Sequence, residues 1–213
     1  MLSNRLFRLS LFSLLFIFLI AANKPAMAAD KEKTSDFINA LATSTLDSLT
    51  EPTLEDAVRQ ARFRVLFRKN FGLPIIARFV LGRYWKQATD AQQVEFQTLL
   101  EDYIVLSYSG RFKDYGGETF EVNEVRADGN KDTIVYTRIV RKKASPVRID
   151  WRVRQPNNHM KVIDVVIEGL SMSLTHRNEF AAVIQRAGSG VDGLIELLRE
   201  KTEGVNRDVS AGS

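Results

Sequence analysis

Apolar residues recur at two different spacings along the chain. Between residues 30 and 114 they return every three or four positions, which predicts amphipathic helices. Between residues 118 and 168 apolar and polar residues alternate, which predicts strands. Helical spacing returns from about residue 174. This order of helices, strands and helices is typical of a single α+β domain.

Four helices are expected before the strands begin. Their expected bounds are residues 30–49, about 53–71, 73–81 and about 90–114. Thr89 and Gln92 have the spacing of a capping box at the start of the fourth helix. Two consecutive glycines, at 116 and 117, are expected to end it.

The second of these helices carries two apolar rows, one aliphatic and one aromatic. The rows are Leu54, Val58, Ala61 and Val65, and Phe63, Phe67 and Phe71. A helix that is apolar over so much of its surface is expected to be deeply packed.

Four strands are expected in the central region. Their expected bounds are residues 118–127, 132–142, 146–155 and 159–168. Connections this short allow only antiparallel neighbours, so the strands should form a meander.

The third strand shows the alternation most clearly, with one apolar and one charged face. The two sets are Val147, Ile149, Trp151 and Val153, and Arg148, Asp150, Arg152 and Arg154. We therefore expect a four-stranded, curved antiparallel sheet whose apolar face is covered by helices from both ends of the chain.

After the sheet, a helix is expected over about 174–187, and a short last helix from Val191 to Leu198. The tail from residue 202 is polar. The expected domain therefore covers residues 29–201, followed by a flexible tail over 202–213.

The first 28 residues have the pattern of a cleaved secretory signal peptide. Arg5 and Arg8 precede an apolar run over 9–22, and Ala26–Ala28 supplies the small-residue cleavage pattern. A transmembrane anchor is the alternative, but the apolar run is shorter than the roughly 20 residues that a spanning helix needs. The sequence therefore predicts an exported, soluble protein.

Removal of the signal peptide changes the charge balance. The whole chain has 30 basic and 26 acidic residues, and three of the basic residues, but no acidic one, lie within residues 1–28. The mature chain would therefore carry 27 basic residues against 26 acidic ones, which argues against nucleic-acid binding. The chain has no cysteine, so it can form neither disulfides nor thiolate metal sites.

Candidate catalytic residues are few. His159 falls in a turn and His176 near the start of a helix, and neither has a second histidine at ligand spacing. Residues 169–173 resemble a G-x-S-x-G nucleophile elbow around Ser171, but Ser173 replaces the last glycine. We expect no catalytic residue, no metal site and no cofactor.

Two further groups admit two interpretations each. Asp150 and Arg152, with their arginine neighbours, form either a polar binding face or an ordinary solvated strand face. Arg83, Tyr84 and Trp85 form either a contact patch or a helical turn whose aromatic rings pack inward.

Several short segments, in order, resemble a known family. They are residues 79–85 (FVLGRYW), Tyr108, Arg111–Phe112, Tyr115, 150–154 (DWRVR), 161–165 (KVIDV), 168–172 (EGLSM) and 177–180 (RNEF). Together they resemble the MlaC family, the periplasmic phospholipid-binding proteins of intermembrane lipid transport, also called the toluene-tolerance auxiliary component family. The hopanoid-associated HpnM proteins are close relatives that share this pattern.

The resemblance implies a periplasmic, monomeric carrier without catalytic residues. Such a carrier shuttles phospholipid between an outer-membrane lipoprotein complex and an inner-membrane ABC transporter with an MCE-domain subunit. The acyl tails of the lipid would enter a cavity between the sheet and the helices, while the head group stays near solvent. The alternatives left open are a carrier of hopanoid or other terpenoid lipid, an exported lipid hydrolase, and an adaptor with a solid core.

The candidate lining of such a cavity consists of inward-facing strand residues and the helix residues expected opposite them. From the sheet these are Ile139, Ile149, Trp151, Val153, Ile163, Val165 and Ile167, and from the helices and the segment before them Ile76, Phe79, Val80, Tyr103, Leu106 and Met172. The alternative for each residue is ordinary core packing.

Overall fold

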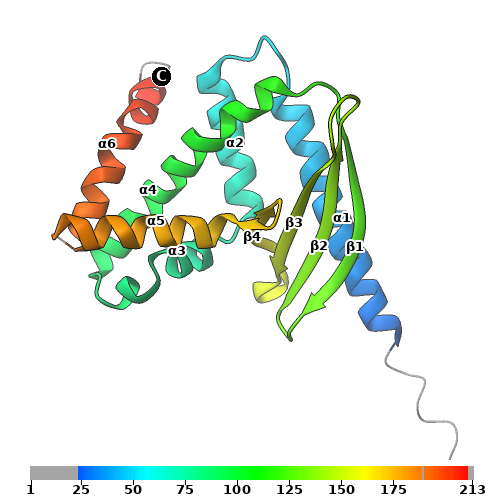
Figure 1. The fold of residues 1–213 in the computed structure, drawn as a ribbon, viewed down its shortest axis with the longest axis horizontal. Helices are drawn as coiled ribbons and strands as arrows, with labels where there is room; N and C mark the ends of the chain where they lie inside the picture. The colour runs from blue at the N-terminus through cyan, green and yellow to red at the C-terminus, as the bar shows by residue number, and fades with distance from the viewer. Residues whose placement is uncertain (1–23, 189, 211–213) are drawn as a thin grey trace, which may run out of the picture.

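The computed structural model describes residues 24–188 and 190–210 (Figure 1). The expected signal peptide lies almost wholly outside these residues and stays a prediction. The helices are α1 (Lys24–Leu49), α2 (Asp56–Asn70), α3 (Leu73–Leu81), α4 (Asp90–Ser109), α5 (Met172–Ala187) and α6 (Val191–Ser210), with short 3-10 turns η1 (Gly82–Lys86), η2 (Gly110–Asp114) and η3 (Pro156–Asn158). The strands are β1 (Thr119–Asp128), β2 (Asp132–Val140), β3 (Val147–Arg154), β4 (Lys161–Ile167) and β5 (Leu170–Ser171).

The predicted α+β architecture is confirmed, with one correction to the sheet. All five strands pair antiparallel in the order β1-β2-β3-β4-β5, so the sheet has five strands and not four. The fifth strand has two residues and follows a turn in which Glu168 and Gly169 both have positive φ, +50° and +84°. Such a turn returns the chain directly onto β4. A strand this short has no periodicity to read, so the sequence pattern could not reveal it.

A β-bulge in β4 changes which residues face the helices. Arg152 pairs with Asp164, whereas Val153 pairs with Val162, so Ile163 is the extra residue between the two pairs. Because of this insertion, Val162 and not Ile163 takes the inward position beside Val153. Ile163, which the sequence pattern places among the inward-facing strand residues, is therefore displaced from that position.

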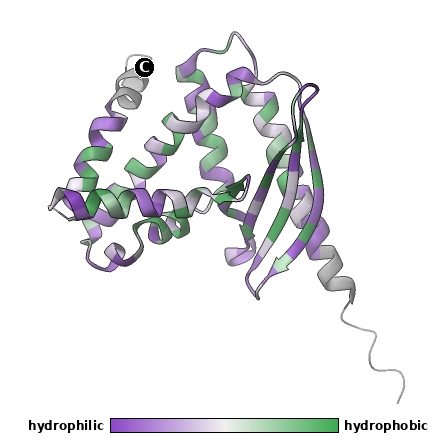
Figure 2. Cartoon of the chain, in the orientation of Figure 1, coloured by the Kyte–Doolittle hydropathy of each residue, from purple (hydrophilic) through white to green (hydrophobic). Residues whose placement is uncertain are grey.

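The apolar interior has two parts. A helical core joins α2, α3, α4, α5 and α6, and includes Phe67, Phe96 and Leu194. A second core lies between α1 and the inner face of the sheet, around Ile38 and Val135. In Figure 1 the helices α2–α6 gather on one side of the sheet while α1 runs along it, and Figure 2 shows hydrophobic and polar stretches alternating along the strands.

The helix α4 begins as predicted and ends earlier than predicted. The Thr89 side chain accepts a hydrogen bond from the Gln92 backbone, and the Gln92 side chain accepts one from the Thr89 backbone, so the capping box is present. The α-helix stops at Ser109, and residues 110–114 form the tighter turn η2. Gly110 weakens the helix at this point because glycine is a poor helix former. This turn carries residues of the site described below.

At the other end of the chain, α6 is longer than the short last helix that the sequence predicts. It extends to Ser210, and Thr202 within it is buried, with its hydroxyl bonded to the Leu198 carbonyl. Because the hydroxyl makes its hydrogen bond within the helix, the polar Thr202 side chain can be buried without losing a partner.

Candidate functional site

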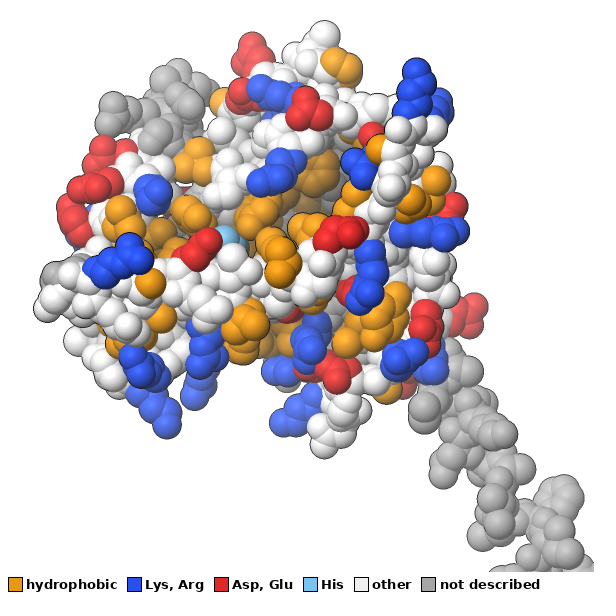
Figure 3. Space-filling view, in the orientation of Figure 1, with side chains coloured by type: hydrophobic (Ala, Val, Ile, Leu, Met, Phe, Trp, Pro, Cys, Tyr) orange, Lys and Arg blue, Asp and Glu red, His pale blue; other side chains and the backbone are white. Residues whose placement is uncertain are grey.

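A cavity of about 480 Å³ lies between the inner face of the sheet and the helices. Figure 3 shows the hollow as a depression lined by hydrophobic side chains between the helical part and the strands. Its apolar residues are Leu41, Ala42, Leu46, Phe63, Leu66, Phe67, Phe71, Ile76, Val80, Leu100, Ile104, Phe112, Phe120, Ile139, Val147, Ile149, Trp151, Val165, Ile167 and Met172. Such a lining excludes water and suits an apolar ligand.

The aromatic row of α2 forms one wall. Phe67 and Phe71 stack with ring centroids 4.7 Å apart, and Phe63 and Phe67 lie parallel at 6.4 Å. Phe112, on η2, contacts the same row at 6.0 Å from Phe63. The helical spacing of four residues places these rings on one face, as the sequence predicts. The aliphatic row of the same helix does not reach the cavity, and Val65 in it is 66% exposed.

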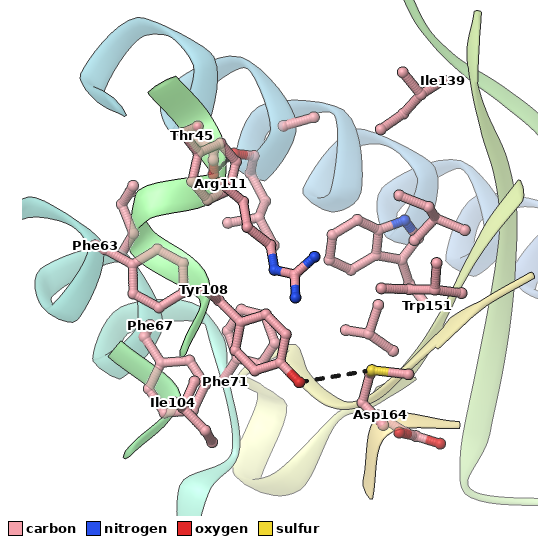
Figure 4. Close-up of a pocket in the computed structure, with 18 of the residues that line it drawn as sticks. Thr45, Phe63, Phe67, Phe71, Ile104, Tyr108, Arg111, Ile139, Trp151 and Asp164 are labelled. Carbon is pink, nitrogen blue, oxygen red and sulfur yellow. Dashed lines mark hydrogen bonds between the residues drawn. The ribbon is translucent and has the colours of Figure 1, made fainter. Parts of the chain in front are cut away.

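The opposite wall is held by a hydrogen-bonded tryptophan. The Trp151 indole N–H donates to the Thr137 hydroxyl at 3.1 Å, and that hydroxyl donates to the Ile149 carbonyl at 2.6 Å. The Phe120 ring meets the indole edge to face at 6.5 Å. Trp151 therefore presents its apolar surface to the cavity while its one polar atom is satisfied (Figure 4). Thr137 was not a sequence candidate, because a threonine within a strand gives no signal of a cross-strand role.

Eight of the thirteen sequence candidates come together in this lining. They are Ile76, Val80, Ile139, Ile149, Trp151, Val165, Ile167 and Met172. The remaining five do not line the cavity. They are Phe79, Tyr103, Leu106, Val153 and Ile163.

Each of these five has another environment. Val153 and Ile163 are buried in protein packing, 3% and 8% exposed, with Ile163 displaced by the bulge. Phe79 faces outward at 43% exposure, with the Arg177 guanidinium 5.1 Å from its ring centroid. Leu106 is half-buried on α4.

Tyr103, the fifth, packs inside the helical core. Its ring lies edge to face against Phe180 and His176, with centroids 5.8 and 5.6 Å away. The helical pattern correctly marks this face of α4 as apolar, but it cannot say whether a buried ring meets a cavity or another ring.

Polar residues gather at one end of the cavity. Thr119 pairs with Val140 in the sheet, so the segment before β1 and the residue after β2 meet at the same edge. The polar residues lining this end are Arg111, Asp114, Tyr115, Glu118 and Arg141. Since Arg111, Asp114 and Arg141 are exposed, this end reaches solvent, and we call it the rim.

A second polar group lies deeper, between α4 and α5. The Tyr108 hydroxyl is 3.1 Å from Nε2 of His176 and 3.7 Å from Sδ of Met172, the contact drawn in Figure 4. Nδ1 of His176 is 3.2 Å from the Glu179 carboxylate. Burial raises the pKa of the Tyr108 hydroxyl, and the nearby Tyr103 raises it further. The sequence predicts His176 to be an ordinary surface residue, but it is 8% exposed and lines the cavity.

The two serines of the near-elbow segment have local roles. The Ser171 hydroxyl donates to Asp164 at 2.6 Å and accepts from the Leu174 amide at 3.0 Å, so it caps the start of α5. The Ser173 hydroxyl donates to the Ile163 carbonyl at 3.3 Å. Among the described residues neither hydroxyl bonds to a histidine, so this segment is a hairpin turn and a helix cap, without the geometry of an activated nucleophile.

The charged face of the sheet is occupied by pairs of opposite charge. Arg148 pairs with Asp150 at 2.6 Å and Arg152 with Asp128 at 2.6 Å. In the segment Arg83–Trp85, Tyr84 is buried and Arg83 is exposed. The Arg83 guanidinium donates a hydrogen bond to the Tyr84 hydroxyl. Tyr84 fits the inward-packing interpretation. On the sheet, the Arg148 side chain is exposed but its partner Asp150 is buried, so this face carries ion pairs and is only partly solvated.

This chain is similar to known proteins in sequence and in structure. The family model described as "MlaC protein" matches residues 39–200. The toluene tolerance protein ttg2D of Pseudomonas putida is 22% identical over 114 residues, which is 54% of this chain and 53% of that protein. The chain thus aligns with only about half the length of that curated relative.

A solved structure is also similar. It is a phospholipid-binding protein from Ralstonia solanacearum in complex with a phospholipid, with 27% sequence identity and a TM-score of 0.70, and the match covers 80% of this chain and 97% of that one. Within the described residues, no helix is both long and apolar enough to cross a bilayer.

Proposed function

The chain belongs to the MlaC family, and on that premise we propose that it is a soluble periplasmic carrier of phospholipid. The observation that carries the proposal is the apolar cavity of about 480 Å³ between sheet and helices. This volume falls within the roughly 300–1,000 Å³ of small-molecule sites. The bound phospholipid in the similar Ralstonia structure supports the same assignment.

The free energy needed to keep acyl chains out of water is consistent with such an apolar lining. Each methylene transferred from water to an apolar site contributes about 0.8 kcal/mol, so exposing two acyl chains of about fifteen carbons each would cost on the order of 20 kcal/mol. A carrier must recover most of this free energy internally. The stacked phenylalanines of α2 and the inward strand residues supply apolar surface of that kind.

The test is the mass of the lipid that co-purifies with the protein. We expect native mass spectrometry of protein purified from its own cell envelope to show a bound diacyl phospholipid. A hopanoid mass would instead support the HpnM-like alternative. Protein that carries no lipid, and takes none from vesicles, would contradict a carrier function.

We further propose that residues 1–28 are cleaved and that the carrier works between two membranes. Its partners would be an inner-membrane ABC transporter complex with an MCE-domain subunit and an outer-membrane lipoprotein complex. The mass of the protein from a periplasmic fraction should lack residues 1–28. Transfer of labelled lipid to each complex, reconstituted separately, would test the partners, and failure of transfer to both would contradict the shuttle.

The hydrolase alternative finds little support at the site. The serine hydroxyls of the near-elbow segment are bonded to Asp164 and to a backbone carbonyl. If a purified sample shows esterase activity, Ser171→Ala and Ser173→Ala should leave it unchanged. Loss of that activity in either variant would support the hydrolase.

A further inference from the structure

We infer that Arg111 recognises the anionic phosphodiester of the cargo, so that the cavity prefers a phospholipid to an uncharged lipid with the same tails. This inference rests on the proposed function, because it concerns the same cavity. Arg111 would bind the head of the lipid, whereas the apolar lining contacts only the tails.

The Arg111 guanidinium lies within the cavity, over an aromatic ring. Arg111 lies on η2 at the rim, and its side chain extends into the open space of the cavity beside the Tyr108 ring (Figure 4). Its Cζ atom is 5.5 Å from the centroid of that ring. A guanidinium over an aromatic ring is attracted to the ring face, and this contact uses none of its N–H groups as hydrogen-bond donors.

No acidic side chain of the described residues neutralises the Arg111 guanidinium. Among the described residues, no carboxylate lies within 4.0 Å of the Arg111 guanidinium, whereas Arg64, Arg148 and Arg154 all pair with acidic side chains. The other arginine at the rim, Arg141, donates from Nε and Nη2 to the Ser145 carbonyl. Arg111 is thus the cavity-lining arginine whose donors have no partner in the described part of the chain.

The rim also carries acidic groups, and their positions leave room for an anion. The Glu118 carboxylate accepts a hydrogen bond from the Gly116 amide at 2.8 Å, so it is turned toward its own loop. Asp114 is exposed to water, which screens its charge. Neither forms an ion pair with Arg111 within the described structure.

The chemistry of a guanidinium suits a phosphodiester. An arginine fork binds a phosphate through two parallel N–H···O bonds, and this geometry suits a phosphodiester better than a single ammonium does. With its tails against the apolar walls, a diacyl lipid would place its glycerol phosphate at the polar, solvent-reaching end. Arg111 is exposed and belongs to that end of the lining, and its guanidinium extends from there into the cavity toward the Tyr108 ring.

The experiment is a competition between two lipids that differ in their phosphate-containing head. The full mature protein is incubated with vesicles containing equal amounts of dioleoylphosphatidylglycerol and dioleoylglycerol, re-isolated, and its extracted lipid is quantified by mass spectrometry. Wild type, Arg111→Gln, Arg111→Lys and Lys113→Gln are compared. Lys113 is the matched control, because it lies on the same turn, carries the same charge, and pairs with Asp56 without lining the cavity.

We expect the wild type to be enriched in phosphatidylglycerol and Arg111→Gln to lower the ratio of the two lipids by about threefold to tenfold. Arg111→Lys should give an intermediate ratio, and Lys113→Gln the ratio of the wild type. An unchanged ratio in Arg111→Gln, or an equal fall in Lys113→Gln, would overturn the inference while leaving the carrier function intact. A wild type that acquires neither lipid would instead overturn the proposed function.

Discussion

The Trp151 indole N–H and the Thr137 hydroxyl form a hydrogen bond of 3.1 Å across two neighbouring strands. Thr137 is 2% exposed and does not line the cavity, so it lies behind Trp151, which does. Because the bond satisfies the only polar atom of the indole, the ring can face an apolar space.

Thr137→Val should therefore destabilise the protein. The change leaves the Trp151 N–H and the Ile149 carbonyl without this side-chain partner, so we expect the free energy of unfolding to fall by about 1–2 kcal/mol in urea denaturation. Thr133→Val is the matched control, since Thr133 lies on the same face of β2 and has no side-chain hydrogen bond in the described structure. Equal losses in the two variants would contradict this role.

Substitutions on the two faces of β4 test which residues line the cavity. Val165 lines the cavity, and its neighbour Val166 belongs to the other face of the strand. Val165→Trp should overfill the cavity and lower the amount of co-purified lipid by about fivefold or more. Val166→Trp should leave the lipid content unchanged. If the two variants carry the same lipid as the wild type, the lining has been assigned incorrectly.

Two arginines of α2 differ in burial and should differ in energetic weight. Arg64 is 19% exposed and contacts the buried carboxylates of Glu101 and Asp102 at 2.6 and 2.5 Å. Arg64→Met should cost about 3–5 kcal/mol, because it removes a partner from two buried charges.

The comparison for that change is Arg68→Met, one turn further along the helix. The Arg68 side chain pairs with the same Glu101 but is 64% exposed, so its loss should cost less than about 1 kcal/mol. Thermal or urea unfolding of both variants measures the difference. A larger effect at Arg68 would show that burial does not set the strength of these pairs.

Substitution of two glycines, Gly169 and Gly110, distinguishes the effect of backbone strain on stability from the effect of packing. Gly169 has a φ of +84°, Gly110 has a φ of −65°, and an added Cβ would meet no atom within 4 Å at either position. Gly169→Ala should destabilise by about 1 kcal/mol, whereas Gly110→Ala should be neutral or stabilise by a few tenths of a kcal/mol. Equal unfolding free energies for the two variants would contradict the assigned turn.

The half-buried Tyr108 hydroxyl should make stability depend on alkaline pH. Burial raises its pKa, so the folded state holds this proton more tightly than the unfolded chain does. The corresponding stability is fully present below about pH 10, the ordinary tyrosine pKa, and is lost as the pH rises above that value through the raised pKa of the folded state. Arg111 opposes the shift, and Tyr103 and Glu179 support it. In urea unfolding at pH 8 and pH 10.5, wild type should lose more stability than Tyr108→Phe, and equal losses would contradict this.

Local patterns in the sequence determined the elements and the dry face of the sheet. The alternation of charged and apolar residues around Trp151 fixed which side of β3 faces inward, because side chains on a strand point to opposite faces in turn. The spacing of Phe63 and Phe67 likewise placed both rings on one face of α2, because residues four apart in a helix are neighbours.

Only the tertiary structure decided which apolar side chains line a cavity and which pack solidly. The bulge at Ile163 depends on pairing with β3, and the roles of Thr137 and Arg111 depend on partners brought close by the fold. Periodicity reports only whether a residue is turned away from water. A cavity is the space left where side chains from distant segments do not fill the interior completely. The sequence of any one segment therefore cannot show whether a cavity is present.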